Sequence, residues 1–410
     1  MQKDHRPTDA STVEAIASLD AIAPQDWDGL ANPGWTLGPG GKPAAARPDA
    51  GPFNPFLTHA FLRSLEEAGC VGRRTGWHPR HLVVRGETGE PIAAAPAYLK
   101  AHSQGEYVFD YGWADAYERA GGRYYPKVQV SVPFTPAQGP RLLVGDTDMA
   151  ARRDILAQAL VALADQSNAS SVHVTFTEDD DFEALTAHGY LARHDTQFHF
   201  ENRGYASPDE FLAALASRKR KQIRRERREA LANDITIRWL TGSDITEAHW
   251  DAFYTFYMDT GSRKWGRPYL NREFFSLLGE RLGGTLCLIL AERGGRPIAG
   301  ALNMIGSHTL FGRYWGCTEH HPFLHFEVCY YQAIDFAIAH RLARVEAGAQ
   351  GEHKLARGYE ACQTRSAHFL RHPGLRDAVA QYLEGERRAV ERQNSVLNTY
   401  APFKKGENER

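Results

Sequence analysis

The chain carries one sequence pattern twice, and this duplication constrains its fold more than any other feature. An apolar stretch, a polar turn and a segment beginning Pro-Ile-Ala occur at 82–95 and again at 288–301. A Gly-Tyr pair followed by a His-Phe pair occurs at 189–200 and again at 358–369. The offsets are 297 − 91 = 206 and 358 − 189 = 169, so the first copy holds 206 − 169 = 37 additional residues. Solenoid repeats span roughly 20–50 residues, so this pattern indicates a duplicated domain.

Composition fits two globular domains. A chain of 410 residues is too long for one ordinary core, and its 42% hydrophobic content is typical of folded proteins. The five cysteines are scattered without a Cys-x-x-Cys pair, which favours free thiols over a disulfide framework or structural zinc. Neither a signal peptide nor an apolar run of about 18 residues is visible. We therefore expect a cytoplasmic protein with no membrane span and no metal site.

The two copies are expected to contain the same elements in the same order. For the first copy, apolar periodicity predicts a helix at 58–68, a hairpin at 82–99, a strand at 107–111, a helix at 155–163, a strand at 172–177, a short helix at 182–187 and a last strand at 191–200. For the second copy, it predicts helices at 247–257 and 272–282, a hairpin at 286–305, a strand at 309–314, a helix at 327–339, a strand at 343–347 and a last strand reaching His368-Phe369.

Changes in composition suggest the domain boundaries. The expected units are a Pro/Gly-rich lead-in at 1–52, a first domain at 53–205 with an insertion at 114–148, a second domain at 206–403 with a basic helix at 207–231 and a C-terminal helix at 375–392, and a polar tail at 404–410. Because the insertion is rich in Pro and Tyr, we expect it to line a site rather than to join the core.

This order of elements resembles the GNAT acyltransferase fold. The segment 182–200, with its Leu185-x-x-x-Gly189-Tyr190 turn, is similar to the end of a GNAT domain. Two such domains in tandem resemble the Fem-type aminoacyl transferases, and more closely a bacterial family of N-acyltransferases described as peptidoglycan biosynthesis/recognition. The residues that carry this resemblance are 124–127, 218–228, 313–316, 325–327 and 346–354. It implies an α/β (α+β) fold of two tandem GNAT-like domains, with mixed central sheets flanked by helices.

The densest polar cluster lies in the second copy, and the resemblance implies that the GNAT topology gathers it around one cleft. Acyl transfer to an amine needs a base, a donor for the oxyanion and an acid for the leaving group. Glu346 or Glu327 is the expected base, and the other candidates are the expected acid or oxyanion donor. The alternative is an ordinary surface or structural role for each, because ion-pair networks imitate sites. The candidate catalytic residues are Glu327, Glu346, His353, Lys354 and His368.

A second group of aromatic and polar residues is expected to bind substrate. Tyr125 and Tyr314 are expected wall residues, because each lies beside a cation in the sequence. Most aromatic residues at this density belong to the core, which is the alternative interpretation. The candidate substrate-binding residues are Tyr125, Lys127, Arg313, Tyr314, His325, Gln350, Arg357 and Tyr359.

A basic stripe precedes the second copy. Among the twelve residues 217–228, eight are cationic and one is acidic, although the whole chain has a net charge of −2. Such a stripe suits the phosphates of tRNA, of a nucleotide-linked precursor or of a coenzyme. The alternative is a solvated helix between the domains. The candidate phosphate-binding residues are Arg218, Lys219, Lys221, Arg224, Arg225 and Arg228.

The acyl donor is left open by the sequence. GNAT enzymes hold the coenzyme A pyrophosphate in a Gly-rich loop, whereas the corresponding segment 315–322 has one glycine. We expect no permanently bound cofactor, and both acyl-CoA and aminoacyl-tRNA are candidate donors. The predicted function is an N-acyltransferase acting on a peptidoglycan-precursor-like or small-molecule amine, with the second copy catalytic. The alternative is a non-catalytic GNAT-like protein that recognises a phosphate-bearing or peptidoglycan-like ligand.

Overall fold

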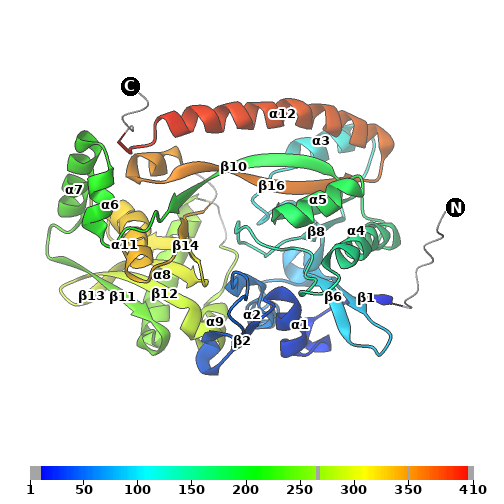
Figure 1. The fold of residues 1–410 in the computed structure, drawn as a ribbon, viewed down its shortest axis with the longest axis horizontal. Helices are drawn as coiled ribbons and strands as arrows, with labels where there is room; N and C mark the ends of the chain where they lie inside the picture. The colour runs from blue at the N-terminus through cyan, green and yellow to red at the C-terminus, as the bar shows by residue number, and fades with distance from the viewer. Residues whose placement is uncertain (1–10, 265–267, 349–350, 405–410) are drawn as a thin grey trace.

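One mixed sheet runs through both copies (Figure 1). The structure, a computed structural model, describes residues 11–264, 268–348 and 351–404. Within these ranges eleven strands join in the order β11-β12-β13-β14-β15-β10-β16-β9-β8-β7-β4. Their bounds are β4 (Trp77–Pro79), β7 (Ala97–Lys100), β8 (Lys127–Val130), β9 (Ser171–Thr177), β10 (Leu191–Glu201), β11 (Ile235–Thr241), β12 (Leu286–Arg293), β13 (Arg296–Ile305), β14 (Thr309–Cys317), β15 (Arg344–Glu346) and β16 (Glu360–Leu370).

Helices and two small sheets flank this sheet. The small sheets consist of β1 (Thr12–Ile16), β5 (His81–Arg85) and β6 (Pro91–Ala95), and of β2 (Trp35–Leu37) and β3 (Pro43–Ala45). The helices before the middle of the chain are α1 (Pro24–Ala31), α2 (His59–Glu67), α3 (Tyr111–Arg119), α4 (Met149–Gln166) and α5 (Asp179–Ala187). Those that follow are α6 (Pro208–Ala214), α7 (Ser217–Ala230), α8 (Glu247–Lys264), α9 (Arg272–Leu282), α10 (Leu324–Phe326), η7 (Glu327–Tyr331), α11 (Gln332–Ala339), η8 (Glu352–Arg357) and α12 (Pro373–Thr399).

The last strand of each copy is exchanged into the other copy. In the described part of the chain, β10 of the first copy pairs only with β15 and β16 of the second, and β16 pairs with β9 of the first. Asp195 lies directly opposite Thr364 in the β10–β16 ladder. Their separation, 364 − 195 = 169, equals the offset of the sequence repeat. A pseudo-twofold axis therefore passes between these two residues, and the sheet is continuous across it.

The long helix α12 covers the exchanged strands along one side of the molecule (Figure 1). Its buried face consists of Leu375, Val379, Leu383 and Leu397. Arg193 on β10 donates to both carboxylate oxygens of Glu386 on α12, at 2.9 and 3.0 Å. In the described residues, neither α12 nor any other helix is long and apolar enough to cross a membrane.

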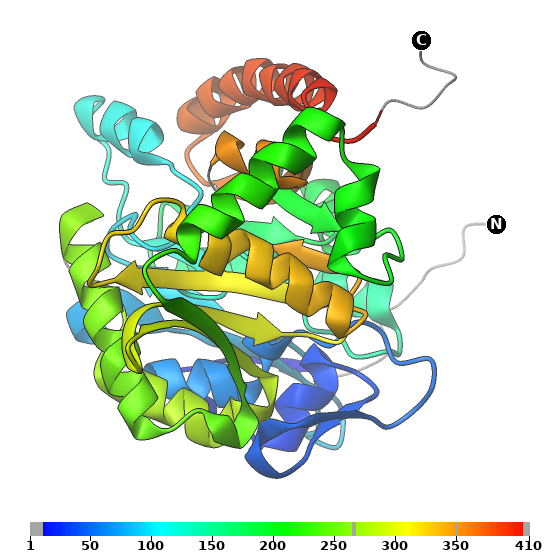
Figure 2. The same ribbon diagram turned by 90° about the vertical axis from the view of Figure 1, so that its left-hand side faces the viewer.

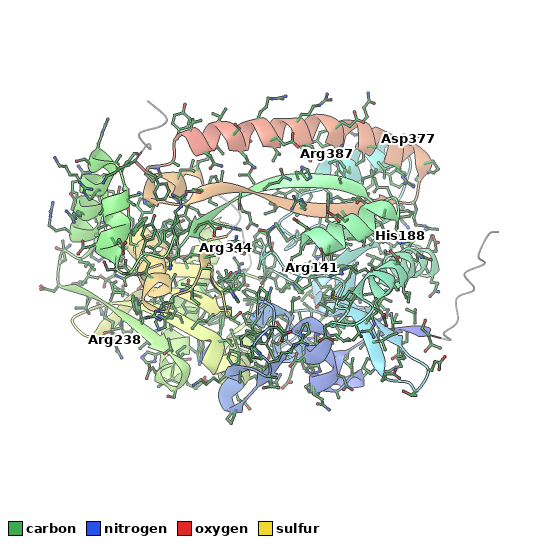
Figure 3. The ribbon with its side chains drawn as sticks, in the orientation of Figure 1. Arg141, His188, Arg238, Arg344, Asp377 and Arg387 are labelled. Atoms are coloured by element: carbon green, nitrogen blue, oxygen red, sulfur yellow. The ribbon has the colours of Figure 1, made fainter. Side chains whose placement is uncertain are left out.

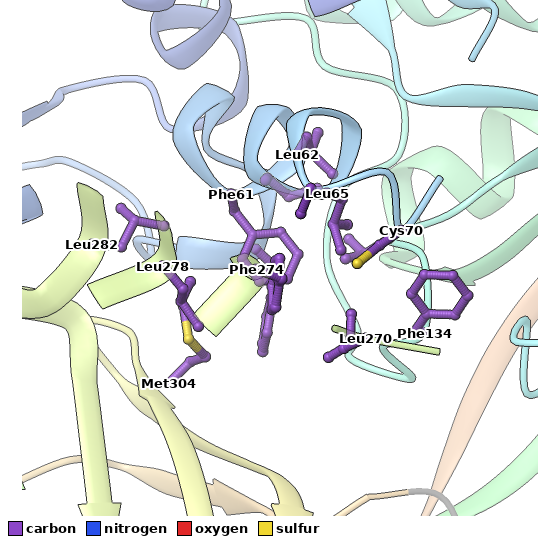
Figure 4. Close-up of a cluster of buried hydrophobic side chains, with 14 of the residues drawn as sticks. Phe61, Leu62, Leu65, Cys70, Phe134, Leu270, Phe274, Leu278, Leu282 and Met304 are labelled. Carbon is purple, nitrogen blue, oxygen red and sulfur yellow. The ribbon is translucent and has the colours of Figure 1, made fainter. Parts of the chain in front are cut away.

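A second contact between the copies closes the opposite side. Helices α2 and α9, each placed before the first hairpin strand of its copy, pack against each other through the apolar cluster in Figure 4. The rings of Phe61 and Phe274 meet edge to face, with 5.8 Å between their centroids. Both helices begin as the sequence predicts, because the side chains of Thr58 and Asn271 cap their first backbone N–H groups.

Two expected elements differ in the structure, and so does the insertion expected at 114–148, part of which joins the core as a buried strand. The predicted strand at 107–111 is a loop leading into α3, and Tyr107 has a φ of 62°, which is incompatible with a strand. Its place beside β7 and β9 is taken by β8, which lies inside the predicted insertion. The predicted helix at 207–231 is two helices, because Leu215 adopts an extended conformation between α6 and α7.

The described part of the lead-in, residues 11–52, contains regular secondary structure. Residues 12–45 contain β1, α1, β2 and β3, and β1 pairs with β5 from Thr12 to Ile16. The tail beyond Lys404 lies outside the described residues. The domain boundaries stay a prediction, because one sheet crosses both copies.

Strand exchange predicts that neither half folds alone. A fragment of residues 1–205 leaves β10 without its partner strands and β9 without β16, so we expect no cooperative unfolding transition for it. Co-expression with residues 206–404 is expected to restore a cooperative complex. The measurement is urea denaturation followed by circular dichroism. A cooperative transition of either fragment on its own would contradict the exchange.

Candidate functional site

A cavity opens where β14 and β15 separate. The two strands are parallel neighbours up to Phe311 and Glu346, and beyond that register Arg313 and Ala347 line a cavity of about 350 Å³. The first copy supplies the opposite wall. We name this space the main cavity. Its lining residues are Gly105, Tyr107, Phe109, Tyr111, Phe134, Pro136, Tyr257, Thr260, Gly261, Pro268, Tyr269, Arg313, Tyr314, Trp315, His325, Tyr330, Ala347, Gly348 and Lys354.

Arg313, which lines this cavity, and Glu346, which lies next to Arg313 but is not among the lining residues, form a buried charge pair. Their side chains are 2% and 4% exposed, and Arg313 Nη2 lies 3.9 Å from Glu346 Oε2. That separation is too long for a hydrogen bond. Arg313 Nε, Arg313 Nη2 and Glu346 Oε2 have no hydrogen-bond partner in the described part of the structure. The pair therefore keeps open hydrogen-bonding capacity in a buried place.

Burial brings two groups of this site into the range of neutral pH. Desolvation raises the pKa of Glu346 to about 7, and the positive charge of Arg313 opposes part of that rise. Desolvation also lowers the pKa of Lys354 to about 7, and repulsion by Arg313 adds to the shift. Lys354 Nζ donates to the carbonyl oxygen of Gly348 at 2.9 Å. A carboxylate and an amine that both titrate near 7 suit proton transfer.

His199 also belongs to this site, and the sequence analysis missed it. It lies on β10 directly opposite Glu346, so strand exchange delivers a first-copy residue to the second-copy site. Its Nε2 lies 3.2 Å from Gln197 Oε1, and burial lowers the pKa of the imidazole to about 3. His199 is therefore neutral, and it lies beside Glu346 in the sheet rather than among the residues that line the main cavity. The repeated His-Phe motif was the one available signal.

His368 lies at the other end of the exchanged strands. It pairs with Leu191, whereas Glu346 pairs with His199, so eight residues of β10 separate the two positions. At ~3.3 Å per residue this is about 26 Å. His368 instead faces His173 of the first copy, with 2.7 Å between their Nδ1 atoms. The structure thus places His368 apart from the cleft in which the sequence grouped it.

A cluster of buried charges lies beneath the loop that forms the first-copy wall. We name Lys100, Glu106, Asp110 and Lys127 the first-copy charge cluster. Lys127 Nζ lies 2.6 Å from Asp110 Oδ2 and 3.4 Å from Glu106 Oε1, and Lys100 Nζ lies 3.3 Å from the same Glu106 atom. Lys127 holds the pKa of Asp110 well below its usual range, against the effect of burial.

This cluster holds the loop in place. Lys127 Nζ also donates to Ser103 Oγ at 2.7 Å, and Ser103 bonds the hydroxyl of Tyr125. Some residues of the loop 103–111 make these contacts, whereas Tyr107 and Phe109 of the same loop line the main cavity. Tyr125 and Lys127, predicted to bind substrate, therefore support the cavity wall and are not among its lining residues.

Arg141 fixes the second stretch of first-copy wall. It is fully buried where the two halves meet, near the middle of the view in Figure 3. Its guanidinium donates only to backbone carbonyls, which belong to Ala137, Gly139, Pro140 and Thr175, at 2.6–3.1 Å. These bonds hold the loop that begins with the cavity-lining Pro136. Nothing in the local sequence pattern marks Arg141 for this role.

Some of the remaining predicted residues line the cavity, and others do not. Tyr314 and His325 line it directly. His353 lies behind the lining, with its Nε2 3.0 Å from the hydroxyl of Tyr330. Tyr359 is fully buried in the core of the second copy, and Gln350 lies outside the described residues.

Glu327 is held in a buried ion pair away from the lining. Arg227 on α7 donates to both of its carboxylate oxygens, at 2.9 and 3.2 Å, and also to Asp335 at 2.6 Å. Arg357 donates to Glu226 of the same helix at 3.0 Å. The structure therefore places Glu327 and Arg357 in contacts that dock α7 on η7 and η8.

The predicted phosphate-binding residues lie on the outer side of α7. Figure 2 shows α6 and α7 beside α11 at the second-copy end of the molecule. The inner face of α7 is anchored by Ile223, Glu226 and Arg227. The cations at the other positions of α7 face outward. Since α7 packs on η7 and η8, which supply Tyr330 and Lys354 to the main cavity, these cations lie behind its wall.

A second cavity of about 310 Å³ adjoins the main one and shares three lining residues with it: Thr260, Trp315 and His325. It occupies the segment after β14, where GNAT enzymes hold a pyrophosphate. Glu319 lines it, and its carboxylate is paired with Arg293 and Arg296. Across the described residues, no group of three or more His, Cys, Asp or Glu is placed to hold a metal ion.

The first-copy charge cluster predicts a large cost for removing one charge. Lys127→Met leaves Asp110 and Glu106 buried without their common partner, which is expected to destabilise the fold by about 3–5 kcal/mol. The double variant Lys127→Met/Asp110→Leu should recover part of that loss. Exposed Lys221→Met serves as the control and should stay within about 0.5 kcal/mol of the parent. Urea denaturation measures all three, and a change below about 1 kcal/mol for Lys127→Met would contradict this account.

Comparison with solved structures identifies the fold. The crystal structure of FemX aligns with a TM-score of 0.52 at 13% identity, covering 88% of this chain and 98% of that one. L-PGS from Bacillus licheniformis has a TM-score of 0.47 at 9% identity, covering 78% and 95%. A tandem GNAT protein from the clavulanic acid biosynthesis pathway has a TM-score of 0.43 at 12% identity, covering 88% and 99%. The predicted α/β fold, a mixed central sheet flanked by helices, is confirmed by the sheet of this chain and by its alignment with FemX.

Comparison with protein families and with curated proteins gives the family. No curated protein matches this sequence significantly. Residues 18–405 match the FemAB-like family, which is described as peptidoglycan biosynthesis/recognition. This match spans nearly the whole chain, so the resemblance noted from the sequence is confirmed. The chain belongs to the FemAB-like family.

Proposed function

We propose that the protein is an N-acyltransferase that moves an acyl or aminoacyl group onto a primary amine in the main cavity. One observation carries this proposal. The buried amine of Lys354 lines the main cavity, the buried carboxylate of Glu346 lies next to the cavity-lining Arg313, and burial shifts the pKa of each to about 7. The FemAB-like family and the FemX-like fold support transfer chemistry in general.

In the proposed reaction Glu346 is the base. Its carboxylate accepts a proton from the ammonium of the acceptor, which frees the nitrogen lone pair to attack the acyl carbonyl carbon. Protonated Lys354 stabilises the oxyanion that develops, gives its proton to the departing thiolate or alkoxide and regains one from the attacking nitrogen, which must lose a second proton to become an amide. The C–N bond forms, the bond from the acyl carbon to sulfur or oxygen breaks, and the two protons lost by the nitrogen are balanced by one on Glu346 and one on the leaving group.

The proposed donor route uses both cavities. The second cavity adjoins the main one, so a donor chain entering there would reach the acceptor beside Trp315 and His325. Glu319 in its wall is already paired with Arg293 and Arg296, which engages these two cations. We assign the phosphates of the donor, an acyl-CoA or an aminoacyl-tRNA, to the outward cations of α7. Calorimetry with each donor distinguishes the two.

The proposal predicts a bell-shaped pH profile for acyl transfer. Glu346 must be deprotonated, so kcat/KM rises with pH through about 7, and Lys354 must be protonated, so it falls above about 7. Lys354→Arg should remove the falling limb and lower the maximum, because an arginine keeps its proton at every accessible pH. Initial rates with a panel of amines and with both donor classes between pH 5 and 9 measure this.

The exposed Lys42→Arg variant is the control and should keep the profile of the parent. A falling limb that survives in Lys354→Arg would remove Lys354 as the acid. Binding of amine and donor without any turnover would instead support the alternative of a recognition protein.

A further inference from the structure

Arg313 lines the main cavity and carries a buried, unused hydrogen-bonding fork. Its Nη1 donates to the carbonyl oxygen of Gly312 at 2.9 Å, while Nε and Nη2 have no hydrogen-bond partner among the residues described. These two atoms are the pair with which a guanidinium binds a carboxylate through two parallel bonds. A buried donor left unmet costs free energy, so a ligand that satisfies both is strongly favoured.

Glu346 offers the complementary charge next to this fork. Its Oε2, also without a hydrogen-bond partner in the described structure, lies 3.9 Å from Arg313 Nη2. A cation and an anion stand side by side, each with an open hydrogen-bonding position. Such a pair matches a ligand that carries an anion and a cation on adjacent atoms.

We infer that the acceptor is an amino acid or a close analogue, whose carboxylate binds the Arg313 fork while its ammonium group binds Glu346. The inference rests on the proposed function, since this ammonium nitrogen is the one that would be acylated. Binding of the carboxylate to Arg313 would hold the nitrogen beside Glu346, the proposed base. The nitrogen would then be oriented for attack on the acyl carbon.

The walls of the main cavity indicate which side chain the amino acid carries. Aromatic rings dominate the lining, and the rings of Phe134 and Tyr269 stack with 4.8 Å between centroids. Such walls favour an apolar or aromatic side chain. The cationic groups among the described lining residues of the cavity are one arginine and one lysine with a pKa of about 7. Their combined charge matches a single negative charge better than the two charges of a phosphate dianion. A volume of about 350 Å³ suits one small molecule rather than a polymer.

The test separates the two charges of the ligand by calorimetry without any donor. The ligands are L-phenylalanine, 2-phenylethylamine, which lacks the carboxylate, and 3-phenylpropanoate, which lacks the amine. Phenylalanine is expected to bind the parent protein at least 10-fold more tightly than either. Arg313→Met should weaken phenylalanine and 3-phenylpropanoate at least 10-fold and leave 2-phenylethylamine unchanged. Glu346→Gln should weaken phenylalanine and 2-phenylethylamine and leave 3-phenylpropanoate unchanged.

Two further variants control for folding and for charge. Arg313→Lys keeps the charge and loses the fork, so its phenylalanine affinity should fall between those of the parent and Arg313→Met. Arg238 lies on the edge strand β11, toward one end of the molecule in Figure 3, is not a lining residue of the main cavity, and pairs with Glu292. Arg238→Met should bind all three ligands as the parent does. Circular dichroism verifies that each variant is folded.

Equal affinities for phenylalanine and 2-phenylethylamine, or an Arg313→Met variant with unchanged affinities, would overturn the inference and leave the proposed function intact. Tighter binding of glycylphenylalanine, whose amine and carboxylate are not adjacent, would also overturn it. Absence of binding by all these ligands overturns it as well. The proposed function is then decided separately, by whether any amine without a carboxylate is acylated.

Discussion

The pairing of β10 with β16 is the interaction on which the rest of the structure depends. It joins the two copies into one sheet and places Asp195 opposite Thr364 on the pseudo-twofold axis. Each copy thereby loses its own last strand and receives that of the other. As a result β10 carries His199 to Glu346, and β16 carries His368 to His173. The site in the second copy is therefore built from both copies.

The two copies use buried charge in different ways. In the first copy Lys127 lies 2.6 Å from Asp110 and 3.4 Å from Glu106, and these contacts hold a loop, although Glu106 Oε1 and Asp110 Oδ1 lack a hydrogen-bond partner among the described residues. In the second copy Arg313 and Glu346 stand 3.9 Å apart with unmet hydrogen bonds, which is costly unless a ligand completes them. The first-copy cluster makes one close ion pair and supports the wall, whereas the second-copy pair makes none and includes a residue that lines the main cavity.

Much of the fold could be predicted from the sequence, because local signals determine it. The helices α2 and α9 follow from capping residues and apolar spacing, and the hairpins follow from polar turns. Strand exchange could not be predicted, since the alternation in β10 is the same whichever copy it joins. Lys127–Val130 was missed as a strand because its four residues stand among prolines and tyrosines. For the site, Lys354 was predicted as part of a dense polar cluster. Arg227, the partner of Glu327, lies 100 residues away in the sequence, so no local pattern could predict this ion pair.

The central claim is that strand exchange leaves acyl-transfer chemistry in the second copy alone. His173 and Glu346 occupy matching positions, opposite His368 and His199. The most direct test compares kcat/KM for acyl transfer in Glu346→Gln and in His173→Gln. The account predicts a loss of at least about 100-fold for Glu346→Gln, the effect of removing a general base, and little change for a folded His173→Gln. Equal losses, or a greater loss in His173→Gln, would contradict it.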